Sequence, residues 1–432
     1  MRFQLLARFR ADAVNLMALT CLQASNAVIP LLIVPFAIAR LGATAYADVA
    51  IAEAVSMIAV AAVLYSFEVD GVSRIVGFRV DTHRDALSDV LSTILFARLL
   101  IFAVVATVLL TVTAAFTSLD PALLACWMLI ALGQVFHSYW FYQGIEFNIA
   151  PALLTLIARF SSLAVIVALV HSAADRLFVP LAVGVPFALA GLASLIYKTS
   201  VLGVRLRWPG VRAVFDYLVQ GRRIFTGTTA VRLYRELNVL IMGIAGVPAA
   251  AISSYALAEK SIKMIQAITR PLNQIAFPKV LRALRGHDRP DRSSARTILR
   301  YTIPQIALVT VVIITLAISF DQVADYSSAL KKFKDLPDFG LLFAIVAPAP
   351  LFGLINFMLG SAGLNFLKEQ RYYLRTILVT GAISSILCFA LSLFVGAPGA
   401  AISFVGAEFL LLLFIANKYR ADPNSAIKGK RP

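Results

Sequence analysis

Seven basic side chains fall within long apolar stretches of this chain, where charge is hardest to accommodate. They are Arg98, Arg159, Arg232, Arg235, Lys260, Lys263 and Arg270. Ionisable residues in a bilayer cost about 3 kcal/mol each on insertion scales and usually face a bundle interior or a wet cavity. Arginine binds phosphate through two parallel hydrogen bonds and stays charged when partly desolvated. The sequence therefore predicts an internal, water-filled, cationic cavity suited to a phosphate-bearing anion.

Helical spacing groups these charges on narrow faces. The four charges Glu259, Lys260, Lys263 and Arg270 fall within an arc of about 100° on one helix. Pairing one turn apart is the alternative reading, joining Arg232 to Glu236 and Glu259 to Lys263. Pairing still leaves an excess of cations, namely Arg98, Arg159, Arg235, Lys260 and Arg270. The carboxylates that could carry a coupling ion are Glu53, Glu236 and Glu259.

The elements that must position these residues are membrane-spanning helices. The chain has 432 residues, of which 60% are hydrophobic, and its mean hydropathy is +0.84. A helix needs about 20 apolar residues to cross a bilayer. The expected spans are 13–40, 44–69, 89–116, 121–142, 150–171, 177–198, 222–246, 249–278, 300–320, 338–366, 375–396 and 399–417. The sequence thus predicts an all-α polytopic membrane protein with about 12 transmembrane helices, in two six-helix lobes around a central cavity.

Charge in the loops predicts the orientation. If the N-terminus is cytoplasmic, the inside segments hold 28 of the 39 lysines and arginines, with Arg159 counted among them, against five outside. The positive-inside rule then places both termini in the cytoplasm. The net charge of +16 lies in loops beside apolar spans, where anionic lipid attracts it, so membrane lipids rather than nucleic acid are the expected partner.

Catalytic chemistry has no visible place in this sequence. The three cysteines fall inside expected spans, and the four histidines show no metal-ligand spacing. We find no phosphate-binding glycine loop and no nucleophile elbow. We expect no enzyme activity, no metal and no cofactor.

The spans divide evenly about the middle of the chain. We expect an N-terminal six-helix lobe over 1–198, a cytoplasmic linker over 199–221, and a C-terminal six-helix lobe with a short cytoplasmic tail over 222–432. Transporters built from two structural repeats hold their substrate between them.

Three motifs add a resemblance. The first span contains Asn26, Pro30, Pro35 and Arg40-Leu41-Gly42, and its prolines are expected to interrupt the helix, either as a static kink or as a moving gate. The fourth span ends Tyr139-Trp140-Phe141-Tyr142-Gln143-Gly144-Ile145-Glu146. The eighth reads Tyr255-x3-Glu259-Lys260, then Pro271 and Phe277-Pro278. In these motifs, and in length and helix count, the chain resembles the Wzx-type O-antigen and exopolysaccharide flippases of the multidrug/oligosaccharidyl-lipid/polysaccharide (MOP) exporter superfamily.

The resemblance implies a function. Such a protein would turn an undecaprenyl-diphosphate-linked oligosaccharide from the cytoplasmic to the periplasmic leaflet of the bacterial inner membrane by alternating access. Asn26, Pro30, Pro35, Arg40, Gln143 and Glu146 would form its gate or motif positions, and the cavity cations would receive the diphosphate. A polysaccharide polymerase and a chain-length regulator are possible partners.

Two rival functions remain. The first is a multidrug or small-molecule antiporter of the same superfamily, although a cationic cavity would repel cationic drugs. The second is a membrane glycosyltransferase or polymerase, which would need a catalytic carboxylate or larger outer loops.

Overall fold

The computed structural model describes residues 17, 21, 25–26, 28–326 and 336–420, and all regular structure in this part of the chain is helical. The all-α fold class is therefore confirmed. Nine helices or runs of adjoining helices within these ranges are long and apolar enough to cross a bilayer. They match nine of the twelve expected spans. Of the other three, 13–40 lies partly outside the described residues, while 222–246 and 249–278 are helical but more polar.

The chain divides into two compact units, residues 1–240 and 241–432. The expected six-helix lobes over 1–198 and 222–432, joined by a linker over 199–221, stay a prediction. Residues 211–221 of that segment form the start of a long helix. This helix packs against others of the first unit.

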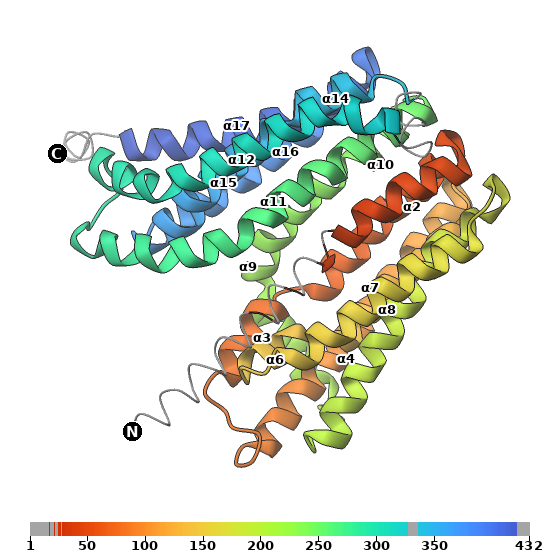
Figure 1. Cartoon of the computed structure of the whole chain (residues 1–432). Coiled ribbons are helices and arrows are strands. Elements are labelled where there is room, and N and C mark those ends of the chain that lie inside the picture. The colour runs from red at the N-terminus through yellow and green to blue at the C-terminus, as the bar shows by residue number, and fades with distance from the viewer. Residues whose placement is uncertain (1–16, 18–20, 22–24, 27, 327–335, 421–432) are drawn as a thin grey trace. The chain divides into compact units, whose positions relative to one another are not determined.

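The first unit begins, within the described residues, with a helix over Val28–Leu41. Its further elements are α2 (Ala43–Leu64), α3 (Phe67–Ile75), α4 (Arg84–Phe116), α5 (Pro121–His137), α6 (Tyr139–Gly144), α7 (Ile149–Leu169), η1 (Ala173–Leu177), α8 (Phe178–Ile196), η2 (Tyr197–Val201) and α9 (Val211–Glu236). Helix α5 packs against α2, α4 and α8, and α7 covers α8. The short helices α3 and α6 lie side by side (Figure 1).

Glycines bring α5 and α8 together closely. A Cβ added at Gly191 of α8 would lie 2.6 Å from the carbonyl oxygen of Gly133 in α5. A Cβ at Gly133 would lie 2.5 Å from the Phe187 ring. Small residues at such crossings allow membrane helices to gain van der Waals contact, which must replace the hydrophobic effect inside lipid.

Two membrane helices of the first unit are broken without glycine or proline at the break. Helix α2 ends at Leu64; the next residue, Tyr65, has a φ of 44° and a ψ of −132°, outside helical geometry, and α3 begins at Phe67. Helix α5 ends at His137, and the next residue, Ser138, is left-handed with φ 47° and ψ 57°. Each break frees backbone groups that must find partners, because no water is available in hydrocarbon.

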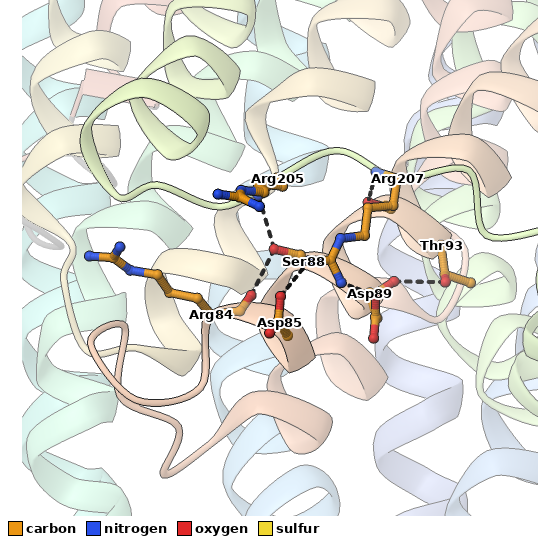
Figure 2. Close-up of polar contacts among 8 residues, drawn as sticks. Arg84, Asp85, Ser88, Asp89, Thr93, Arg205 and Arg207 are labelled. Carbon is orange, nitrogen blue, oxygen red and sulfur yellow. Dashed lines mark hydrogen bonds and ion pairs between the residues drawn. The ribbon is translucent and has the colours of Figure 1, made fainter.

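The stretch 202–210, which lies within the expected linker, runs along the first turns of α4 (Figure 2). The backbone N–H of Arg205 donates to Ser88 Oγ at 2.9 Å, and that of Arg207 donates to Ser92 Oγ at 2.9 Å. The Arg207 guanidinium pairs with Asp85 and lies 3.7 Å from an Asp89 oxygen. This part of the expected linker is therefore fixed to the first unit.

The second unit contains α10 (Asn238–Ile244, which begins at the boundary), α11 (Ala249–Ala283), η3 (Leu284–Gly286), α12 (Arg292–Tyr326), α14 (Phe339–Val346), α15 (Ala349–Asn356), η4 (Phe357–Leu364), α16 (Gln370–Val395) and α17 (Ala397–Arg420). Helices α16 and α17 form a hairpin whose turn is Gly396, at φ 73°. Element η4 is a π-helix, a rare geometry that is frequent at functional sites.

Candidate functional site

Arg98, in the middle of α4, is fully buried and ion-paired. Its Nη2 lies 2.6 Å from Glu68 Oε1 in the first turn of α3, and its Nη1 donates to the Gln134 carbonyl at 3.0 Å. The guanidinium also lies 5.5 Å from the centroid of the Phe67 ring. The expectation that Arg98 belongs to an unpaired cationic excess is therefore wrong, because Glu68 neutralises it.

Lys198, the last residue of the expected span 177–198, is fully buried in η2, which directly follows α8. Its Nζ donates to the carbonyls of Phe136 at 2.9 Å and His137 at 3.3 Å. Ser194 Oγ also donates to the His137 carbonyl, at 2.9 Å. These are the last carbonyls of α5, which the break at Ser138 leaves without helical partners.

Arg98 and Lys198 thus act as C-terminal caps supplied from other helices. Cations are favourable at a helix C-terminus, where the dipole is negative. Glu68 lies at the opposite pole, in the first turn of α3, where a carboxylate is favourable. Together these charges cap the end of α5 and connect it through Arg98 to the start of α3. We therefore assign Arg98 to the structure, and its predicted part in substrate binding is not favoured by its burial.

Arg159 and Asn26, predicted separately as a cavity cation and a gate residue, are brought together. Arg159 Nε donates to Asn26 Oδ1 at 2.9 Å, and the guanidinium lies 5.3 Å from the Phe187 ring centroid. Arg159 is half-buried, and its positive charge interacts with the carboxylate of Glu53. Among the described residues, no carboxylate lies within ion-pair distance of Arg159. Its guanidinium therefore keeps donors for an anion.

The helix over Val28–Leu41 includes Pro30 and Pro35. A continuous helix can still bend at proline, so the expected kink or gate at these residues stays a prediction. Membrane helices tolerate proline where neighbouring groups satisfy the freed carbonyls. Arg40, at the end of this helix, is exposed and lies 5.2 Å from the Phe36 ring centroid.

The aromatic motif at 139–146 turns its polar residues outward. Trp140 is fully buried against α3, where a Cβ added to Gly71 would lie 2.7 Å from its ring. Gly144 approaches Ile75 of α3 as closely. Gln143 and Glu146 are exposed, and Glu146 has a φ of +57°. The tryptophan and the glycine therefore fix the packing of α6, while the two predicted motif side chains remain accessible.

In the second unit, the predicted pair on α11 is confirmed. Lys263 Nζ lies 3.4 Å from Glu259 Oε1, and the Glu259 side chain is 5% exposed. Lys260 is half-buried and has an interaction of its own. The same holds separately for Arg235 and Glu236 of the first unit. The side chains of Arg232 and Arg270 lie outside the described ones.

Sequence reasoning missed a second buried carboxylate, Glu408 of α17. It is fully buried, and Asn356 Nδ2 donates both to its Oε2 at 3.0 Å and to its backbone carbonyl at 2.8 Å. The signal was available, because Glu408 is the only acidic residue in the apolar segment 397–417. Such isolated intramembrane carboxylates are candidates for function by default.

The described residues form a multi-pass membrane protein with the fold of solved transporter structures. The inward-facing conformation of a multidrug resistance MATE family transporter of the MOP superfamily matches with a TM-score of 0.65 at 14% identity, over 96% of this chain and 100% of that one. The lipid II flippase MurJ, in an inward closed conformation, matches with a TM-score of 0.61 at 12% identity, over 98% and 89%.

Among curated proteins, the chain is similar to the putative O-antigen transporter of Escherichia coli (strain K12). The two are 19% identical over 417 residues, which cover 93% of this chain and 96% of that protein. No protein-family profile matches the chain. The resemblance found in the motifs is confirmed by these matches, all of which are to transporters or a flippase rather than enzymes.

Proposed function

We propose that this protein is a flippase for undecaprenyl-diphosphate-linked oligosaccharide, moving it from the cytoplasmic to the periplasmic leaflet by alternating access. The observation that carries the proposal is Arg159, a half-buried cation whose described partner is the neutral amide of Asn26. A guanidinium so held binds a phosphate without first losing a carboxylate. The similarity to a putative O-antigen transporter supports the same substrate class.

Complementation tests this function. A bacterial strain that lacks its own flippase for O-antigen or exopolysaccharide, and is matched in repeat unit, should regain surface polysaccharide when it expresses this chain. Arg159→Gln should abolish the rescue while the protein remains in the membrane, and Arg159→Lys should restore it in part, because lysine loses the two-point geometry. Arg371→Gln, at an exposed arginine of α16, is the matched control and should complement fully.

The rival function, a small-molecule antiporter, is tested in the same strains. Expression should leave resistance to cationic drugs unchanged, because a cationic site repels them. Raised drug resistance without any polysaccharide rescue would replace the flippase proposal with the antiporter.

The orientation is part of the proposal. Both termini lie in the cytoplasm, on the basis of the loop charges. Reporter fusions after His171 should then read periplasmic, and fusions after Arg212 cytoplasmic. Polysaccharide polymerase and chain-length regulator would act on the product at the periplasmic face.

Energy for turnover has two candidate sources. With the inside negative, expelling an anion is downhill by about 2.3 kcal/mol per charge per 100 mV. Fixed cations that move with the substrate would cancel its charge and with it this electrical driving force. Turnover would then need another source, such as an ion that returns bound to Glu53, Glu236 or Glu259. Of these, Glu259 is favoured, since Lys263 at 3.4 Å could release it to an ion. Flipping in proteoliposomes that follows the potential alone, and survives Glu259→Gln, would remove the carboxylate from the mechanism.

A further inference from the structure

A cavity of about 570 Å³ lies within the second unit, where the beginning of α12 meets the end of α17. Its basic wall consists of Arg292, Arg296 and Arg300 from α12 and Arg420 from α17. All four arginines are exposed. The cavity is thus distinct from the buried Glu259–Lys263 pair and from the Arg159 site.

The rest of the cavity lining is apolar. Leu299 and Ile303 of α12 contribute to it, together with Leu359 and Tyr419. Ile303 is 60% exposed, as expected of a side chain that faces lipid. The Tyr419 hydroxyl donates to the Leu359 carbonyl at 2.8 Å, which ties α17 to η4 and fixes the floor of the cavity.

Carboxylates of the described residues do not neutralise the arginines of this cavity. Within the described residues, Arg292, Arg296 and Arg300 form no ion pair, although they follow one another at one-turn intervals, where like charges destabilise a helix. Nearby, Lys418 is paired with Glu369 at 2.9 Å, and Asp291, which precedes α12, accepts the backbone N–H of Ser294 at 2.6 Å. The three α12 arginines extend over about 12 Å of helix axis. An anion from outside the protein would relieve their repulsion.

We propose that this cavity binds an acidic phospholipid of the cytoplasmic leaflet, with its phosphates on the arginines and an acyl chain along Leu299 and Ile303. The leaflet rests on the proposed orientation, but the binding itself does not. Basic pockets at the cytoplasmic ends of membrane helices recognise such headgroups. A soluble anion would not need the apolar wall. The adjacent phosphates of a polyprenyl diphosphate are too compact to engage arginines spread over two helical turns, so a headgroup with separated phosphates fits better.

Binding of cardiolipin to the purified full-length chain in detergent tests this proposal, with native mass spectrometry as the readout. The double variant Arg296→Gln/Arg300→Gln removes two charges from the cavity. The matched control is Arg371→Gln/Arg375→Gln, which removes two exposed arginines with the same one-turn spacing at the start of α16. Cardiolipin affinity should fall about tenfold in the cavity variant and less than twofold in the control. Phosphatidylcholine binding should not differ among the three proteins.

Two results would overturn the proposal. Equal loss of cardiolipin in both double variants would mean general attraction to a basic surface. Displacement of cardiolipin by an equal concentration of farnesyl diphosphate would assign the cavity to a polyprenyl diphosphate instead. If the double variant does not fold, Arg420→Gln alone at the end of α17 should still weaken cardiolipin binding. None of these readouts depends on polysaccharide export. Failure of the lipid-binding proposal therefore leaves the flippase proposal standing, and failure of the flippase proposal leaves the lipid-binding proposal standing.

Discussion

Replacing Arg98 by methionine tests whether the buried charges at the two helix breaks stabilise the fold. The change keeps most of the side-chain volume but removes the ion pair with Glu68 and the hydrogen bond to the Gln134 carbonyl. Removing one partner of a buried pair costs about 3–5 kcal/mol. Because Glu68 is 24% exposed while Arg98 is 0% exposed, water screens part of this cost. We expect a loss of about 3 kcal/mol from the free energy of unfolding.

The partner variant gives the sharper signature. Glu68→Gln neutralises the carboxylate that Arg98→Met leaves uncompensated, so the double variant Arg98→Met/Glu68→Gln should be more stable than Arg98→Met alone. Unfolding in mixed micelles by titration with sodium dodecyl sulfate measures all four proteins as a double-mutant cycle. Arg159→Met, at a half-buried cation, is the control and should cost less than about 1.5 kcal/mol. Additive losses in the cycle, or an unchanged Arg98→Met midpoint, would refute the capping account.

Three further changes test turns and helix ends. Glu146→Gly should raise the free energy of unfolding by about 1 kcal/mol, because a φ of +57° suits glycine. If this variant no longer restores surface polysaccharide despite that gain, the Glu146 carboxylate itself is needed. Gly71→Ala should cost about 1–3 kcal/mol in the same titration, because its Cβ would lie 2.7 Å from Trp140, and an unchanged midpoint would contradict the packing of α3 on α6. Hydrogen bonds from Ser294 hold the pKa of Asp291 below its ordinary value, so this cap of α12 should stabilise above about pH 4 and weaken as the pH falls through the folded pKa. In Asp291→Ala, the free energy of unfolding measured against pH should lack this pH-dependent stabilisation. A pH dependence identical to that of the wild type would exclude the cap.

Periodicity and length were enough to predict most of the fold. Nine spans coincide with expected ones because uninterrupted apolar runs of this length have few alternatives in a membrane. The Glu259–Lys263 pair was also predictable, since one-turn spacing on a single helix fixes the two side chains near each other.

The helix breaks could not be predicted in the same way. Tyr65 and Ser138 carry no glycine or proline signal, and the carbonyls freed at Ser138 are capped by residues distant in sequence. Arg98 was misassigned because its partner, Glu68, lies 30 positions earlier on another helix. The contact of Arg159 with Asn26, across 133 positions, was equally invisible to spacing rules. Sequence thus located the charged residues but not their partners, which are set by tertiary packing.

The caps at the end of α5 have a consequence for biogenesis. When α5 first leaves the ribosome, Arg98 has already been made, but Lys198 and Ser194 have not, and they supply the donors for the Phe136 and His137 carbonyls. In lipid, a helix continuing through Ser138 would satisfy these carbonyls on its own. We therefore expect α5 and α6 to enter the membrane as one helix, and Ser138 to become left-handed only after α8 has been inserted beside them.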